Sequence, residues 1–157
     1  MKQSIQLANR FREVTLNGTW IANTNYKDQI TSIDWKQAIT KISSLNTIAL
    51  LTFHINYYLE GILQVFEGGT LDIRDKYSFD APEITSESDW NTLKKSLLTN
   101  AEAFASHIEQ LSDSDLESVF VDEKYGTYRR NIEAMIEHSY YHLGQISLIK
   151  KMIQEQG

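Results

Sequence analysis

Four long stretches of the chain repeat apolar side chains at intervals of three and four residues, the spacing that lines one face of an α-helix. This pattern predicts helices over 3–16, 34–67, 88–111 and 129–154. In the last stretch the repeating positions are Ile132, Met135, Ser139, His142, Ile146, Ile149 and Ile153. Four amphipathic helices with no strand-rich region predict an all-α four-helix bundle, in which each helix buries its stripe against the others.

Capping and stop signals mark the ends of the predicted helices. Asn17-Gly18 and Gly68-Gly69 follow the first two apolar runs, as residues that end helices do. Asp34-Trp-Lys-Gln37 and Ser86-Glu-Ser-Asp89 have the form of N-terminal caps. Within the second stretch the helical pattern pauses near Ser43-Ser44.

Three connections separate the predicted helices. The segment 19–30 is polar but carries Trp20 and Tyr26, so we expect an ordered connection packed on the bundle. Residues 70–85 hold the only proline of the chain and read as a long crossover loop. Residues 116–128 fit either a short β-hairpin or an irregular loop.

Composition narrows the functional classes. With 41% hydrophobic residues and 157 residues in all, we expect one domain, 1–157, able to bury a full core. A net charge of −6 disfavours partners recognised through phosphate charge, so no nucleic-acid partner is expected. The sequence shows neither a signal-peptide core nor an apolar run long enough to span a membrane, which predicts a cytoplasmic protein without a membrane partner.

Two histidines four residues apart, His138 and His142, are the strongest functional signal. Residues at this spacing are neighbours on a helix, with Cβ atoms about 5–6 Å apart, so both rings are able to reach one metal ion. His54 lies in another helical stretch, and three protein nitrogens with an open position are typical of a catalytic zinc site. The chain has no cysteine, so any metal is held by nitrogen and oxygen, and no protein thiolate is available as a nucleophile.

Two alternatives to a metal site stay open for these histidines. A pair four apart also arises by coincidence, and a buried imidazole is equally satisfied by hydrogen bonds to a tyrosine; the tyrosines nearest in sequence are Tyr57, Tyr58, Tyr140 and Tyr141. The pattern is not the His-Glu-x-x-His of zinc peptidases, because Ser139 stands where a helical ligand pair would need its glutamate base. His107 on the third helix is interpreted as a part-exposed histidine outside the site.

One histidine in the second helix followed by His-x-x-x-His-Leu-Gly-Gln in the fourth resembles the DinB/YfiT-like family. Four segments carry the resemblance: 45–54, 75–80, 124–128 and 137–145. The resemblance implies a bundle of up-down-down-up connectivity with long connections, a homodimer, and a divalent metal (Zn, Ni, Fe or Mn) bound by His54, His138 and His142. Characterised relatives include transferases that use low-molecular-weight thiols such as bacillithiol or mycothiol.

Two functions of different class follow from the motif and the resemblance together. The first is a metal-dependent transferase, or a hydrolase, which joins a low-molecular-weight thiol to an electrophilic small molecule; Tyr58 and Gln145, one turn beyond ligands, are candidates to orient substrate or bound water. The second is a non-catalytic dimeric bundle whose metal site is structural or vestigial. A metal ion that binds exchangeable ligands such as azide or thiol indicates the first function, and an ion closed to such ligands indicates the second.

Overall fold

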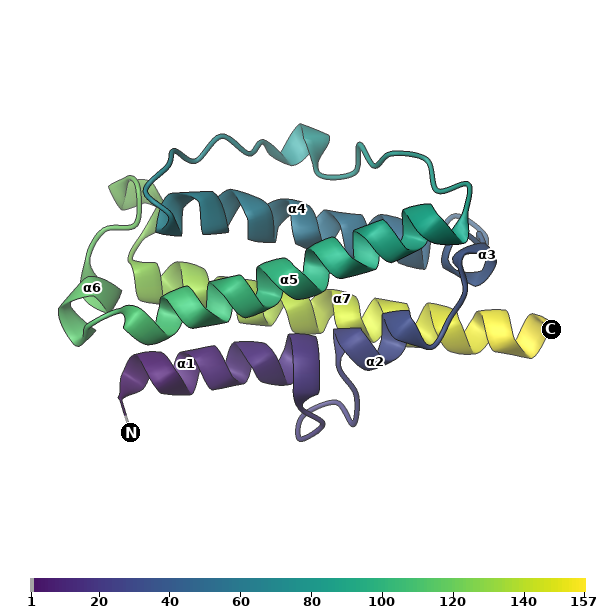
Figure 1. The fold of residues 1–157 in the computed structure, drawn as a ribbon, viewed down its shortest axis with the longest axis horizontal. Helices are drawn as coiled ribbons and strands as arrows, with labels where there is room; N and C mark the ends of the chain where they lie inside the picture. Colours follow the sequence, from purple (N-terminus) through teal and green to yellow (C-terminus); the bar gives the residue numbers. More distant parts are fainter. Residues whose placement is uncertain (1) are drawn as a thin grey trace.

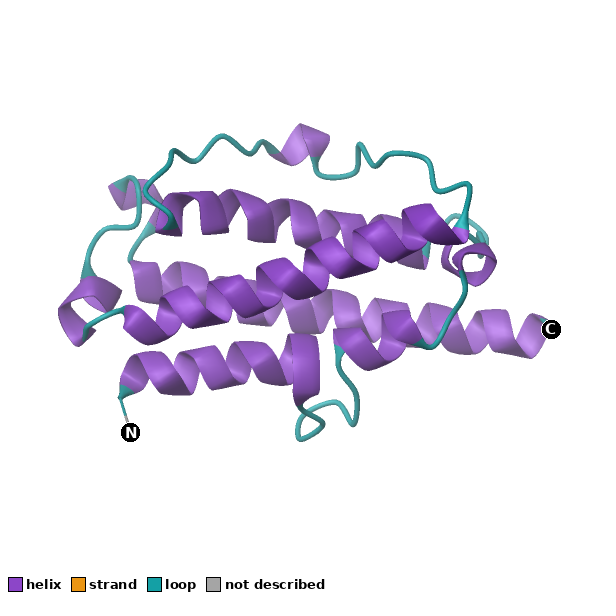
Figure 2. Cartoon of the chain, viewed as in Figure 1, coloured by secondary structure: helices purple, strands orange, loops and turns teal. Residues whose placement is uncertain are grey.

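The computed structural model describes residues 2–157, and its framework is four long helices (Figures 1 and 2). They are α1 (Gln3–Arg12), α4 (Ile48–Phe66), α5 (Glu87–Gln110) and α7 (Tyr128–Gln156). A π-helical turn, η1 (Glu13–Asn17), continues α1. The shorter elements are α2 (Tyr26–Thr31), α3 (Trp35–Ala38), η2 (Asp75–Tyr77), α6 (Asp113–Glu117) and η3 (Glu123–Tyr125). The all-α prediction is confirmed.

The helix directions follow the up-down-down-up order that the resemblance implied. In Figure 1, α1 and α7 run one way along the bundle, and α4 and α5 run the other way. Because α4 and α5 are parallel, the chain between them must return along the whole bundle, and the crossover loop does so over the outer side of α4. The loop therefore lies across the helix that carries His54.

A continuous apolar core joins the helices, with α5 packed against both α1 and α4. At its centre the rings of Phe11 and Phe104 meet edge to face, with centroids 5.0 Å apart. Full burial of such a side chain contributes about 1.5–3 kcal/mol. At the edge of the same seam, Arg12 forms ion pairs with Glu102 and Glu109. These contacts fix α1 on α5.

Two glycines shape the crossover loop. Gly68 has a φ of +90° and ends α4 in the left-handed region, as the sequence predicted. Gly61 lies in the middle of α4, and a side chain there would collide with Ile73 of the loop. The absence of a Cβ at Gly61 lets the loop lie directly against the helix.

The predicted second helix is interrupted for longer than the sequence suggested. Its capping box at Asp34 forms, but the helix that follows, α3, spans only Trp35–Ala38. Ser43 has a φ of +50°, a left-handed conformation that no helix accommodates. A new helix begins at Ile48, where the side chain of Thr47 accepts a hydrogen bond from the Leu50 amide.

The connection after α1 contains a helix that the sequence analysis missed. Tyr26 begins α2, is fully buried, and donates a hydrogen bond from its hydroxyl to the Ser139 carbonyl of α7 at 2.7 Å. The expected packing of Tyr26 is therefore confirmed. The expectation for Trp20 was wrong, because this side chain is 85% exposed at the tip of the connection.

The segment before α7 forms one bridge rather than a hairpin with strands. Val119 and Thr127 make a single antiparallel bridge, extended by a hydrogen bond from the Phe120 amide to the Gly126 carbonyl. Between α5 and this bridge, Ser112 and Asp115 form the capping box of α6. No helix within residues 2–157 is both long enough and apolar enough to cross a membrane.

Candidate metal centre

Three histidines converge between α4 and α7. His54 comes from the middle of α4, and His138 and His142 come from successive turns of α7. One ring nitrogen from each side chain lies within 4.8 Å of the other two. His54 and His142 are buried, and His138 is part-exposed. The apolar stripes bring the three rings together, because His142 lies on the inward stripe of α7 and His54 beside that of α4.

The same ring atom points inward in each histidine. The Nε2 atoms of His138 and His142 are 2.9 Å apart, and those of His54 and His138 are 3.3 Å apart. Two nitrogens bound to one ion at about 2.0–2.1 Å lie roughly 2.9–3.4 Å apart when the angle at the ion is about 90–110°. The observed spacings fit three nitrogens sharing one divalent ion.

Contacts at the opposite ring nitrogens fix two of the tautomers. His54 Nδ1 lies 3.2 Å from the carbonyl oxygen of Ser78, and His142 Nδ1 lies 2.6 Å from Oε1 of Gln145. A carbonyl oxygen only accepts, so both Nδ1 atoms carry the hydrogen and donate. The Nε2 atoms of His54 and His142 then both present lone pairs to the centre.

This arrangement weakens the purely hydrogen-bonded interpretation of the histidines. Neutral His138 has at most one hydrogen at Nε2, and that hydrogen points at only one of the two facing lone pairs at a time. The lone pair of the other histidine, His54 or His142, then faces the Nε2 atom of His138 with no hydrogen between the two nitrogens. A shared cation satisfies all three lone pairs, whereas no tyrosine hydroxyl is hydrogen-bonded to these nitrogens within residues 2–157.

The surroundings keep the histidines neutral. Burial, followed by the proximity of His142 and His54, lowers the pKa of His138 from its usual 6.5 to about 4. Burial also lowers the pKa of His54 and of His142, partly opposed by the hydrogen bonds to Ser78 and Gln145. Metal ligation requires the neutral imidazole, so the site is in its ligating form at neutral pH without displacing a proton.

Aromatic side chains enclose the three imidazoles. Phe79 of the crossover loop stacks on His54, with ring centroids 4.1 Å apart and planes 10° from parallel. Tyr58 lies edge-on to both His54 and His138, and Tyr141 lies edge-on to His142. The Tyr58 hydroxyl donates to Asp75 at 2.8 Å, which ties the crossover loop to the wall of the site.

Two of the other residues selected from the sequence lie at the histidine cluster, and one lies away from it. Tyr58 and Gln145 both contact the cluster, Gln145 through His142 and Tyr58 through its ring. His107 lies on α5, 3.7 Å from Glu67, and is no part of the cluster. Residues 75–80, which carried part of the resemblance, include the Ser78 carbonyl and Phe79. The sequence did not predict a role for either residue. Ser78 acts through its backbone carbonyl, which every residue type has, and Phe79 lies in a loop without a regular pattern.

A comparison with known protein families identifies the family of this chain. The family described as the DinB superfamily matches residues 31–146, which is most of the chain and includes all three histidines. The chain belongs to the DinB superfamily. Neither the curated proteins nor the solved structures include a significant match to it.

Membership of the DinB superfamily agrees with the fold and with the histidine cluster. The resemblance carried by the His-x-x-x-His-Leu-Gly-Gln motif is confirmed, and the bundle has the predicted helical class. The three histidines that the resemblance nominated lie close together and are positioned to hold a metal ion.

Proposed function

We propose that this DinB superfamily protein is a metal-dependent enzyme that joins a low-molecular-weight thiol to an electrophilic small molecule. The observation that carries the proposal is the convergence of three Nε2 atoms, two of which must present lone pairs to the centre. The thiol chemistry rests on the family resemblance, and the lack of cysteine in the chain suits a sulfur nucleophile that is supplied by a cosubstrate. Of the candidate ions Zn, Ni, Fe and Mn, three imidazoles suit several, and the ligand set does not select one of them.

The residues of the chain would prepare the site in three ways. His54, His138 and His142 would hold the ion, and Gln145 would keep the Nδ1 hydrogen of His142 directed away from it. Tyr58, held by Asp75, would line the place where substrate approaches. When bound, the divalent ion would supply the positive charge that favours the thiolate over the thiol at neutral pH.

The transfer itself balances without an oxidant or reductant. The thiol proton passes to solvent, and the sulfur forms a bond to an electrophilic carbon. The leaving group departs with the electron pair of its own bond to that carbon, or an opened ring retains that pair and takes up a proton. At a Michael acceptor the π pair of the double bond moves to the neighbouring carbon, which takes up a proton. The protein's part is to position the two reactants and to keep the thiol ionised.

Elemental analysis is the first test of this proposal. Protein purified without chelator or added metal is expected to contain about one divalent ion per chain, and His142→Ala is expected to contain almost none. His107→Ala is the matched control, because it removes the same side chain from a helix outside the cluster. No metal in the wild type, even after loading with each of the four ions, would contradict the proposal.

A thiol-consumption screen then separates an enzyme from a non-catalytic bundle. Metal-loaded protein is expected to accelerate thiol consumption with at least one class of electrophile, and His142→Ala to abolish that acceleration. A bound ion that admits neither azide nor thiol, together with no consumption across alkyl halides, epoxides and Michael acceptors, would favour the structural site.

A homodimer is also part of the proposal. Tyr141 and Leu148 lie two turns apart on α7 and are 64% and 57% exposed, an apolar surface suited to a second copy of the chain. Sedimentation equilibrium of the wild type is expected to give twice the chain mass, and Leu148→Glu to reduce it. A monomeric wild type would remove the dimer without affecting the metal site.

A further inference from the structure

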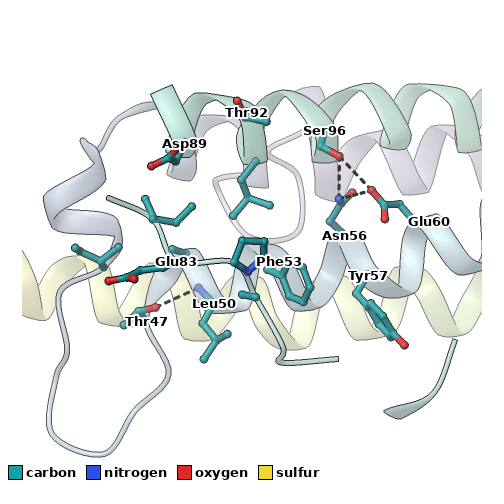
Figure 3. Close-up of a pocket in the computed structure, with 16 residues that line it drawn as sticks. Thr47, Leu50, Phe53, Asn56, Tyr57, Glu60, Glu83, Asp89, Thr92 and Ser96 are labelled. Atoms are coloured by element: carbon teal, nitrogen blue, oxygen red, sulfur yellow. Dashed lines mark hydrogen bonds between the residues drawn. The ribbon is translucent and has the colours of Figure 1, made fainter. Parts of the chain in front are cut away.

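A cavity of about 520 Å³ lies between α4, α5 and the crossover loop, on a different face of α4 from the histidines (Figure 3). None of the three histidines lines it. Its size falls in the range of small-molecule sites, which is about 300–1,000 Å³. Ala81, Pro82 and Ile84 of the loop cover it, and Leu50, Phe53 and Leu93 form much of its apolar wall.

The charged side chains of this cavity all have one sign. Glu60, Glu83 and Asp89 line it, whereas no Lys, Arg or His does so among residues 2–157. Figure 3 shows Glu60 at one end and Glu83 and Asp89 toward the other, with Phe53 between them. Lys94, next to Leu93 in sequence, is directed elsewhere, toward Glu87 and the ring of Trp90. The cavity is therefore apolar in the middle and acidic at both ends.

A hydrogen-bond network holds the carboxylate of Glu60 in place. Its Oε1 accepts from Asn56 Nδ2 at 2.9 Å, from Ser96 Oγ at 3.2 Å and from Asn100 Nδ2 at 3.1 Å. Asn56 is 5% exposed, whereas Glu60 itself is exposed, so the network holds this carboxylate at the water-accessible rim of the cavity. A carboxylate fixed by three donors keeps its position before any ligand arrives.

The same network leaves this end of the cavity without a free donor. Asn56 Nδ2 also donates to Ser96 Oγ, and Asn100 Nδ2 also donates to Asn56 Oδ1, so the hydrogens of Asn56, Ser96 and Asn100 are all engaged. Glu60 Oε2 has no hydrogen-bond partner in the part of the chain that the structure describes. A ligand group bound at Glu60 must therefore donate hydrogen bonds.

We propose that this cavity binds an aliphatic diamine, with one ammonium group at Glu60, the second at Glu83 and Asp89, and the hydrocarbon chain along Phe53. An ammonium supplies donors and positive charge, both of which the ends of the cavity require. The methylene chain replaces water along the apolar wall and packs on the ring of Phe53. An anionic ligand at the Glu60 end meets only acceptors.

The proposal is tested with three probes that share one eight-carbon chain: octamethylenediamine, octamethylene glycol and suberate. Isothermal titration of the full-length protein is expected to give a Kd for the diamine of about 10–1,000 μM. The glycol is expected to bind about 10-fold more weakly, and suberate not measurably. Suberate binding as tightly as the diamine, or no saturable diamine binding up to about 10 mM, would overturn the proposal.

Variants assign the binding to this cavity. Glu60→Gln keeps Oε1 as an acceptor but removes the charge, and is expected to weaken diamine binding about 10-fold while leaving glycol binding unchanged. Glu155→Gln, an exposed carboxylate near the end of α7, is the matched control. Thr92 is exposed and lines the cavity, so Thr92→Trp is expected to block it without disturbing the core. Unchanged diamine binding in both cavity variants would place it elsewhere and reject the proposal.

This test is independent of the metal centre. His142→Ala removes a proposed metal ligand from α7 and leaves every residue that lines the cavity intact. Diamine binding is therefore expected to persist in His142→Ala, whether or not the protein binds metal. Loss of diamine binding in that variant, with its fold retained by circular dichroism, would show that the probe binds at the histidines instead.

Discussion

His54 and Asn56 lie two residues apart on α4 and are almost equally buried, at 6% and 5% exposure. The amide hydrogens of Asn56 find acceptors within the protein, whereas the Nε2 lone pair of His54 faces other nitrogens. Asn56 belongs to a network with Glu60, Ser96 and Asn100 in which every amide hydrogen has an acceptor. His54 belongs to a cluster in which nitrogen lone pairs face one another. In the first network every donor finds an acceptor within the protein, whereas the second calls for a cation between its lone pairs.

The contrast between the network and the cluster shows which buried polar groups indicate function. A network in which every donor has an acceptor holds helices in register and leaves no hydrogen without a partner. A buried cluster with too few hydrogens needs a proton or a metal ion. Because burial lowers the pKa values of all three histidines, a proton is the less favoured of these two.

The largest effect is expected from removing one nitrogen of the cluster. His54→Ala should lower zinc affinity at least 100-fold, since loss of a ligand should exceed the roughly 10–100-fold cost of losing an outer contact. Competition with a chromophoric chelator measures this affinity. Asn56→Ala, two residues away on the same helix, should leave zinc affinity unchanged; equal losses in both variants would mean that the effect is one of folding.

Asn56→Ala should instead reduce the free energy of unfolding. The change leaves the Asn100 amide short of an acceptor and Glu60 short of a donor, and we expect a loss of about 2–3 kcal/mol. Urea denaturation of metal-free protein measures it. An unchanged midpoint would show that water replaces the lost partners and that the network is less closed than its geometry indicates.

Acid should destabilise the metal-free histidine cluster. The pKa of His138 is about 4 in the folded chain and 6.5 when unperturbed, so between these values the unfolded chain binds more protons. Stability should therefore decline as the pH falls from about 6.5 to 4, by about 2 kcal/mol after allowance for partial exposure, and then level off as far as this group is concerned.

Comparison of variants isolates that contribution from carboxylates that titrate in the same range. His138→Gln should flatten the fall in unfolding free energy between pH 6.5 and 4, whereas His107→Gln should retain the wild-type profile. Urea denaturation of chelator-treated protein at several pH values gives both curves. Parallel curves for the wild type and His138→Gln would contradict the lowered pKa.

The sequence was most informative where side-chain spacing carries the structure. The step of four between His138 and His142 predicted that both rings share a helix face, and the apolar stripes predicted the four helices. His54 joins this pair as a third nitrogen from another helical stretch, and the family resemblance assigns it to the same site, whereas no periodicity relates residues on different helices.

The features that the sequence did not predict depend on backbone groups or on long-range packing. The Ser78 carbonyl that fixes the His54 tautomer belongs to a loop with no regular pattern. The short helix α2 spans only Tyr26–Thr31, and the burial of Tyr26 against α7 stabilises it more than its own periodicity does. The cavity under the crossover loop depends on where that loop returns, which local propensities do not determine.

The smallest predicted effect concerns Gln145, the contact that connects the cluster to its surroundings. Its Oε1 lies 2.6 Å from His142 Nδ1 and keeps the hydrogen on that atom, so that Nε2 stays available to a metal. Gln145→Leu should weaken zinc binding about 10-fold, because the ring then loses the acceptor that selects its tautomer and orientation. The same chelator competition measures the change.

Two further substitutions show whether Gln145 acts through that hydrogen bond. Gln145→Glu retains an acceptor at the same position and should keep zinc affinity near or above that of the wild type, since a carboxylate accepts from the imidazole more strongly. Gln154→Leu makes the same apolar change at an exposed position of α7 and should have no effect. If Gln145→Leu and Gln145→Glu both match the wild type in zinc affinity, helix packing alone orients His142. The histidine cluster would then keep its geometry without an outer hydrogen bond, whereas the Asn56 network is held by hydrogen bonds.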